Sequence, residues 1–198
     1  MRRRILSTLL LAFALVAVSV DPARADSANN IFRFGGAWVV PNGSSNYNDG
    51  TQDINFESTD GWGYFIDYER RLIPWLGIDL QVLYAQPDFE ATAAGGTTTT
   101  DSVTVWNGNL GVNFHLFARS RFDLYLGAFA GWTDFDANVD AAFGYGGVLG
   151  FDIGLTKSGL ALTLGVRYSQ TDADVTGISG VSVSYDPLVY QLGLGWRF

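Results

Sequence analysis

Residues 107–116 read NGNLGVNFHL, and from position 110 onward large apolar side chains alternate with glycine, asparagine and histidine. A β-strand points successive side chains to opposite faces, so this stretch predicts a strand with one apolar face and one amide-rich face. The apolar face suits contact with lipid. The amides need hydrogen-bond partners that lipid cannot supply, and therefore they would have to face the interior of a barrel.

Seven other stretches show the same alternation of large apolar residues with small or polar ones. They are residues 32–40, 62–69, 75–85, 122–126, 143–151, 160–168 and 188–198. Eight such strands predict an all-β fold, an eight-stranded antiparallel up-and-down transmembrane β-barrel. A soluble β-sandwich also alternates, so the connections between the strands must separate the two classes of protein.

The predicted connections fall into a mostly long set and a short set. If the chain starts in the periplasm, long connections on the outside and short turns in the periplasm are typical of outer-membrane barrels. The long connections are residues 41–58, 86–102, 135–141 and 170–182, and the short ones are 71–74, 117–120 and 156–159. Basic residues gather at the short turns and acidic residues at the long connections. Length and charge together favour the barrel.

Residues 1–25 have the pattern of an export signal. Positions 2–4 are arginines, an apolar run covers 5–20, and residues 23–25 form a small-x-small cleavage site. We therefore expect residues 1–25 to be a signal peptide and residues 26–198 to form the outer-membrane barrel. An uncleaved helical anchor is the alternative.

Charge and cysteine content exclude several classes of function. Of the 12 basic and 20 acidic residues the signal holds four and one, which leaves 8 and 19 and a formal net charge of −11. Nucleic-acid binding depends on phosphate neutralisation by Lys and Arg, so we expect no nucleic-acid partner. The chain has no cysteine, which excludes disulfides and thiolate metal sites.

Three motifs resemble a known family. Residues 33–41 read RFGGAWVVP, residues 85–89 read AQPDF, and residues 185–198 read YDPLVYQLGLGWRF. In this combination they resemble proteins of the OmpW family. The resemblance implies an eight-stranded barrel in the outer membrane of a Gram-negative bacterium, in contact with outer-membrane lipid and lipopolysaccharide. It also implies that the barrel-assembly machinery recognises the terminal strand, which ends at Phe198.

Charges of both signs occupy positions that should face the lumen. An eight-stranded barrel is only wide enough for its own side chains, so we expect no open pore of the porin type. Buried charges need partners of opposite sign, and a plug of ion pairs is the simplest outcome. The predicted lumen ion pairs involve Arg33, Asp67, Glu69, Asp79, Asp123, Asp152, Arg167 and Arg197.

Toward the outer end, the inward positions carry little charge. These positions are expected to line an apolar outer mouth, and ordinary packing under the loops is the alternative. They are Val39, Leu83, Ala85, Val105, Phe129, Tyr185 and Val189. The resemblance to the OmpW family implies passage of small hydrophobic molecules through such a mouth.

Pro41, Pro87 and Pro187 all lie at predicted outer ends of strands. Proline cannot donate to a strand ladder and is confined to strand ends, edges or bulges. A ladder interrupted there would open a lateral gap toward the bilayer. The sequence thus suggests a narrow channel for small hydrophobic molecules with lateral exit. The alternative is a non-transporting surface barrel for adhesion or envelope structure.

Catalytic and metal sites find little support. The single histidine, His115, is followed by Leu116 and Phe117, whereas lipid A deacylases of similar shape use a His-x-Ser pattern. A nucleophile and base cannot be assembled from this motif, so we expect no enzymatic activity and no cofactor. Two acidic pairs offer oxygen ligands for calcium or magnesium, but solvated loop acids are the simpler interpretation. These pairs are Asp134 with Asp136 and Asp172 with Asp174.

Overall fold

The computed structural model describes residues 29–42, 44–48, 53–93, 96, 98–118, 120–136, 139–176 and 182–198. The predicted signal peptide lies outside these residues. Within them the secondary structure is entirely β. The strands are β1 (Asn30–Val40), β2 (Ser44–Asn48), β3 (Asp53–Ile73), β4 (Leu76–Ala93), β5 (Thr98–Ser102), β6 (Val105–His115), β7 (Phe122–Phe135), β8 (Ala142–Gly154), β9 (Leu160–Asp174), β10 (Ser182–Ser184) and β11 (Leu188–Arg197). The described part of the chain holds no helix long and apolar enough to cross a bilayer.

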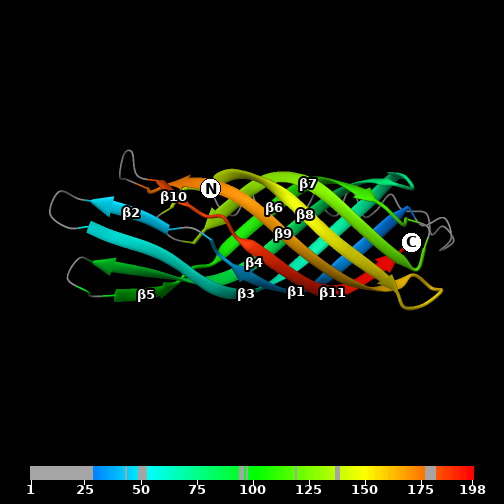
Figure 1. The fold of residues 1–198 in the computed structure, drawn as a ribbon, viewed down its shortest axis with the longest axis horizontal. Coiled ribbons are helices and arrows are strands. Elements are labelled where there is room, and N and C mark those ends of the chain that lie inside the picture. Colours follow the sequence, from blue (N-terminus) through cyan, green and yellow to red (C-terminus); the bar gives the residue numbers. More distant parts are fainter. Residues whose placement is uncertain are drawn as a thin grey trace.

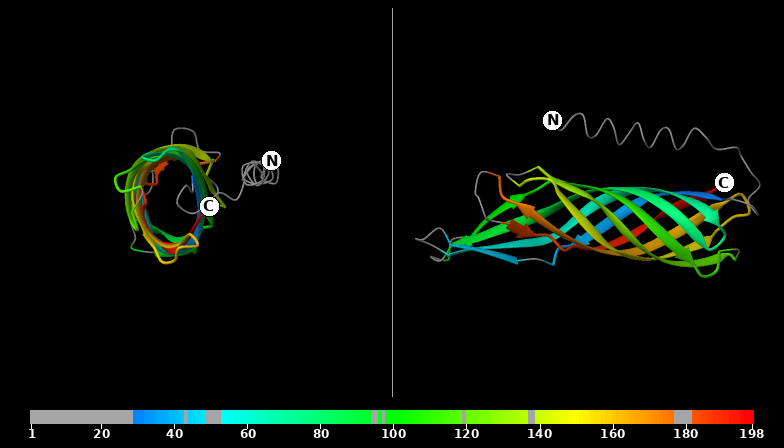
Figure 2. Two further views of the ribbon diagram at one scale, coloured as in Figure 1. Left: turned by 90° about the vertical axis from the view of Figure 1, so that its right-hand side faces the viewer. Right: turned by 90° about the horizontal axis from the view of Figure 1, so that it is seen from above.

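Eight long strands form a closed ring. Each is antiparallel to two neighbours, in the order β1, β3, β4, β6, β7, β8, β9 and β11, and β11 returns to β1. The closing ladder runs from Ile31 opposite Arg197 to Val40 opposite Leu188. Seen end on, the strands surround one lumen, and seen from the side they are tilted (Figure 2). The prediction of an all-β, eight-stranded antiparallel barrel is confirmed.

The ring extends beyond its core at one end, where β2, β5 and β10 pair with β3, β4 and β9 (Figure 1). We call this the outer end, following the predicted orientation. Residues 41–58 and 86–102 were predicted as connections, but much of each is strand. Strand β5 begins with three threonines, whose branched side chains favour the extended backbone of a strand. In β5 all five side chains are exposed, so alternation of hydrophobicity could not reveal this strand.

Burial follows the alternation that the sequence predicted. In β6, Asn109, Asn113 and His115 are buried, whereas Leu110 is 61% exposed and Phe114 is 45% exposed. In this strand the large apolar side chains therefore face outward and the polar ones face the lumen. This arrangement is the reverse of a soluble protein and suits a barrel in lipid.

Arg33 of β1 is buried in the lumen and forms ion pairs with three carboxylates. Its Nη1 lies 2.7 Å from an oxygen of Asp67, and its Nη2 lies 2.9 Å from oxygens of both Glu69 and Asp152. The guanidinium carbon also lies 4.8 Å from the centre of the Tyr125 ring. Asp152 belongs to β8, which does not neighbour β1, so this ion pair spans the lumen.

A second group of charges closes the periplasmic end of the lumen. The Nδ1 of His115 lies 3.0 Å from Asp123, and its Nε2 lies 2.6 Å from Glu69. Arg71 also pairs with Asp123 and donates to the carbonyl of Ala118. Both ring nitrogens of the histidine thus face carboxylates, a geometry that suits the imidazolium form.

Arg167 of β9 completes the set from the outer side. Its Nη2 lies 2.7 Å from Asp79 and 3.4 Å from Asp67. We call the whole set the charged layer. It consists of Arg33, Arg71, Arg167, Arg197, His115, Asp67, Glu69, Asp79, Asp123 and Asp152.

We predict that Arg33→Met strongly destabilises the barrel. The change leaves the carboxylates of Asp67, Glu69 and Asp152 buried without their shared cation, and removing one partner of a buried ion pair costs about 3–5 kcal/mol. Urea unfolding in micelles, followed by tryptophan fluorescence, measures the free energy of unfolding. The matched control is Arg70→Met, at an exposed position of β3, which should change that free energy by about 0.5 kcal/mol or less. Equal effects of the two variants would contradict the central role of Arg33.

Candidate functional site

An apolar cluster fills the lumen on the outer side of the charged layer. Six of the seven residues predicted for the outer mouth belong to it. We call it the outer apolar cluster, and its buried members are Ala37, Val39, Phe65, Leu83, Ala85, Val105, Phe135, Ala173, Tyr185 and Val189. None of them is more than 7% exposed, so their side chains fill the lumen in this conformation.

Strand parity and register bring these side chains together. Val39 of β1 lies directly opposite Val189 of β11, and Ala85 of β4 lies opposite Val105 of β6. Sequence reasoning missed Ala37, Phe65, Phe135 and Ala173. The alternation of faces along each strand could have revealed them. Phe135, for example, lies on the same inward face of β7 as Phe129, six residues further on.

Phe129 does not join the outer apolar cluster. It packs instead with Tyr125 and Val148 in a separate buried group. The guanidinium carbon of Arg167 lies 4.9 Å from the centre of the Phe129 ring, a cation–π contact. The prediction that Phe129 lines the outer mouth is therefore wrong, because register places it beside the outermost arginine of the charged layer.

Tyr185 closes the cluster at its outer end. It lies between β10 and β11, and its ring centre is 5.4 Å from that of Phe135 and 6.4 Å from that of Phe89. Its backbone N–H donates to the carbonyl of Thr171 at 2.8 Å. Burial raises the pKa of the Tyr185 phenol well above its usual value, so the hydroxyl stays neutral.

Pro87 lies at an interruption of the barrel wall. It is buried inside β4 rather than at a strand end, which corrects the prediction. On one side the ladder with β3 shifts register between Ser58 and Gly61. On the other side β4 leaves β6 after Ala85 and pairs with β5 from Asp88 onward. We call this place, residues 58–61 opposite 87–88, the ladder interruption.

The interruption is closed in this conformation. A Cβ added at Gly61 would lie 2.5 Å from the Cα of Pro87, so the two backbones touch. The hydroxyl of Thr59 donates to the carbonyl of Asp88 at 3.3 Å. On the β3 side, one side-chain hydrogen bond and a close backbone contact therefore replace the regular ladder. On the other side, the backbone N–H of Val103 donates to the carbonyl of Pro87 at 3.0 Å.

Pro41 and Pro187 lie at the outer end of the closing seam. The ladder between β1 and β11 ends at Val40 opposite Leu188, directly before Pro41 and after Pro187. Both prolines therefore stand at strand ends, as the sequence suggested. They are separated from Pro87 by β3, so the three prolines do not surround one gap.

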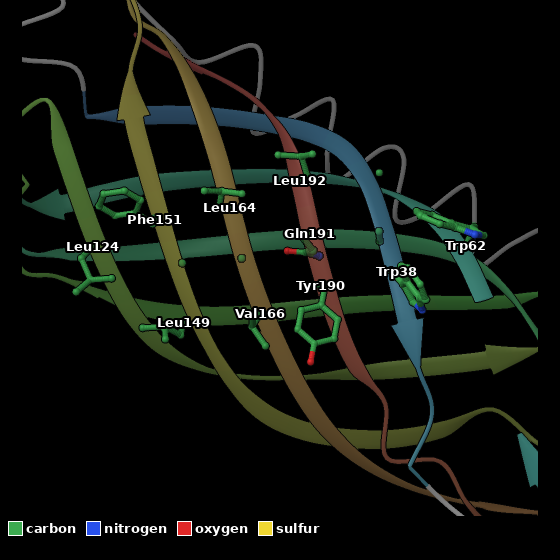
Figure 3. A pocket seen from close by; sticks show the side chains of 14 residues that line it. Trp38, Trp62, Leu124, Leu149, Phe151, Leu164, Val166, Tyr190, Gln191 and Leu192 are labelled. Atoms are coloured by element: carbon green, nitrogen blue, oxygen red, sulfur yellow. The ribbon is translucent and has the colours of Figure 1, made fainter. Parts of the chain in front are cut away.

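A groove of about 630 Å³ crosses the lipid-facing surface beside the interruption. Two rows of side chains form its walls, as Figure 3 shows: Tyr190, Val166 and Leu149 in one, and Leu192, Leu164 and Phe151 in the other. At one end stand Trp38 and Trp62, whose ring centres are 5.0 Å apart. Trp38 donates to Asp60 at 3.2 Å, and Asp60 belongs to the ladder interruption. The sequence did not reveal this groove, because the rows depend on register.

No metal centre emerges from the described residues, among which no group of three or more His, Cys, Asp or Glu side chains could hold an ion. Of the paired loop acids, Asp172 accepts a hydrogen bond from Ser184 at 2.6 Å. His115 lies within the charged layer, where its ring contacts two carboxylates.

Solved structures resemble the fold over nearly its whole length. The outer membrane protein OprG from Pseudomonas aeruginosa is 20% identical, with a TM-score of 0.66 over 86% of this chain and 96% of that one. AlkL, solved in lipid bilayers, is 18% identical, with a TM-score of 0.60 over 90% of this chain and 94% of that one. Neisserial surface protein A is 15% identical, with a TM-score of 0.50 over 86% and 96% of the two chains. No curated protein sequence matches this chain significantly.

The sequence also matches a family model over most of its length. The family is described as outer membrane protein beta-barrel domain, and the match covers residues 8–198. It agrees with the closed ring of eight strands and with the resemblance that the motifs suggested. The protein therefore belongs to the outer membrane protein β-barrel family and is a barrel of the Gram-negative outer membrane.

Proposed function

We propose that the barrel is a narrow channel that admits small hydrophobic molecules through the outer apolar cluster and releases them sideways into the bilayer. The observation that supports this proposal is the position of the ladder interruption. Pro87 follows Ala85 of the cluster by two residues on the same inward face of β4, so the wall is irregular at the height where the lumen is apolar.

The charged layer supports a lateral rather than an axial route. Arg33 alone joins carboxylates from β3 and β8 across the lumen. An apolar solute moving straight through would have to separate these buried charges, and nothing in the solute would replace the lost interactions. A sideways route leaves the charged layer intact.

The lipid-facing groove supports the final step of that route. Its end at Trp38 and Trp62 adjoins the ladder interruption through Asp60, and its walls are almost entirely apolar. A solute leaving the lumen near Pro87 would meet an apolar surface that continues into the hydrocarbon. Passage requires movement at Tyr185 and at Thr59, because the lumen and the wall are closed in this conformation.

The second candidate function is a non-transporting surface barrel for adhesion or envelope structure. The observation in its favour is the closed lumen, together with the polar strands that extend beyond the ring, such as β5 with all side chains exposed. This reading predicts that cells with and without the gene take up hydrophobic solutes equally.

The terminal strand suits recognition by the barrel-assembly machinery, which we include in the proposal. Phe198 exchanges two backbone hydrogen bonds with Asn30, each of 3.0 Å, at the periplasmic end of the closing seam. The last residue of the chain is therefore part of the contact that closes the ring. Export behind residues 1–25 belongs to the same proposal.

A reversible cross-link tests the lateral exit. The chain has no natural cysteine, so the double variant Thr59→Cys/Asp88→Cys places a single disulfide across the ladder interruption. Oxidised, it should reduce gene-dependent uptake of a small apolar solute at least tenfold, and reduction should restore it. Uptake is measured as solute accumulated by cells with and without the gene.

The matched control is Ile66→Cys/Val82→Cys, a register pair in the regular part of the same ladder. Its oxidation should leave uptake unchanged. Full uptake through the oxidised Thr59/Asp88 variant would exclude exit at this place.

A substitution in the outer apolar cluster tests entry through the lumen. Ala85 is 1% exposed, so Ala85→Trp would fill the path with a large ring and should lower uptake to the level of cells without the gene. Ala128→Trp is the control, because Ala128 is exposed on the lipid-facing side of β7. Heat-dependent mobility on gels verifies that both variants fold. Unchanged uptake through a folded Ala85→Trp barrel would exclude this route.

A further inference from the structure

The outer half of the lumen has two unlike walls. Toward the outer end, the inward residues of β11, β1, β3 and β4 are mostly apolar members of the outer apolar cluster, such as Val189, Val39 and Leu83. The inward residues of β6, β7 and β9 add Val105, Phe135 and Ala173 to that cluster, but they also include a set of amides and hydroxyls, which we call the polar strip. Its members are Asn107, Asn109, Thr133, Ser169 and Thr171.

Register places the polar strip at the height of the apolar cluster. Asn107 lies opposite Leu83 on one side and opposite Thr133 on the other. The side chains of the strip are themselves linked, because Asn109 donates to Asn107, and Asn107 donates to Thr133 at 2.8 Å. A molecule between the two walls would therefore meet apolar groups on one side and hydrogen-bonding groups on the other.

Arg167 lies at the base of these two walls and has donors without partners. Its Cα lies opposite that of Val189, and the residue is only 4% exposed. Nη2 is held by Asp79 and Asp67, but Nε and Nη1 have no hydrogen-bond partner among the described residues. Buried N–H groups without acceptors are unfavourable and uncommon. They mark a place where an oxygen atom of a ligand would be stabilised.

Arg33 provides the contrast. Its Nε, Nη1 and Nη2 all donate to carboxylates, so none of its nitrogens is left without a partner. Arg197 also has nitrogens without a hydrogen-bond partner, but it lies at the periplasmic end of the charged layer, so Arg167 is the arginine with free donors next to the outer apolar cluster.

The charge of the lumen decides what kind of oxygen suits Arg167. The charged layer already holds five carboxylates against four arginines and His115. A further anion would leave a net negative charge in a low-dielectric space, which is unfavourable. A neutral carbonyl, ester or hydroxyl oxygen accepts the same hydrogen bond without adding charge.

From these observations we infer that the outer lumen selects small apolar molecules that carry a neutral hydrogen-bond-accepting oxygen, such as ketones, esters or alcohols, over plain hydrocarbons. The alkyl part packs on the outer apolar cluster, and the oxygen accepts from Nε or Nη1 of Arg167, beside the polar strip. This inference rests on the proposed channel function and specifies its substrate class.

Uptake of two solutes of equal chain length, 2-octanone and octane, tests the inference. For each, accumulation in cells with the gene is divided by accumulation in cells without it, which removes the intrinsic difference in partitioning. The ratio for the ketone should exceed that for the alkane by roughly two- to tenfold, the range expected for one hydrogen bond. Arg167→Lys keeps a cation for Asp79 but deletes the guanidinium donors, and it should bring the two ratios together.

Arg33→Lys is the matched control. It makes the same replacement in the same lumen at an arginine whose nitrogens all have carboxylate partners, and it should keep the preference for the ketone. If Arg167→Lys does not fold, Thr133→Val takes its place, because it removes one hydroxyl of the polar strip at nearly constant shape and should reduce the preference. Folding of each variant is verified by heat-dependent mobility on gels.

The outcomes separate the inference from the function on which it rests. If neither solute enters faster with the gene than without it, the channel function fails. If both enter faster by the same factor, in the wild type and in Arg167→Lys alike, the channel stands and the selectivity for oxygen-bearing solutes is overturned. A preference that both Arg→Lys variants lose equally would assign the effect to general damage of the charged layer and would also overturn the inference.

Discussion

The ion pairs of Arg33 hold together strands that do not touch one another. Asp67 and Glu69 come from the neighbouring strand β3, but Asp152 comes from β8 on the far side of the lumen. A buried guanidinium is tolerated only when carboxylates surround it, and these carboxylates meet only when the ring is closed. Closure and charge pairing therefore depend on each other. The outer apolar cluster packs on the outer side of the charged layer, which forms its periplasmic boundary.

Under the proposed function, this division lets one short barrel keep a charged layer across its axis and still offer a lateral path to apolar solutes. The layer that blocks the axis is made of strong, mutually supporting contacts, whereas the β3 side of the wall near Pro87 is held by a backbone contact and the Thr59 hydrogen bond, and the other side by the hydrogen bond from the Val103 N–H to the Pro87 carbonyl. Movement is expected where the stabilising contacts are fewest. The irregular part of the wall thus lies beside the apolar part of the lumen and beside the lipid-facing groove, which supports the proposed lateral route.

Much of the fold could be read from the sequence, because in a barrel the period of two assigns every residue to the lipid or to the lumen. The eight strands and the inward positions of Arg33 and Asp152 followed from that period alone. Register did not. It places Phe129 beside Arg167 instead of in the outer mouth, Pro87 inside β4, and the two lipid-facing rows in line across β11, β9 and β8. Strand β5, polar on both faces, gave no periodic signal. Arg71, which the sequence assigned to a turn, continues the inward series of β3 and belongs to the lumen.

Contacts between an apolar solute and the methyl groups of the barrel test the central claim most directly. They are measured as intermolecular nuclear Overhauser effects from a small protonated hydrocarbon to methyl-labelled protein in deuterated lipid nanodiscs. The account predicts contacts to lumen methyls of the outer apolar cluster, such as those of Val39, Val105 and Val189, and none to Thr163, which faces the lumen at the level of Asp152. Contacts confined to lipid-facing methyls such as those of Leu110 and Leu126, or extending through the charged layer to Thr163, would contradict it.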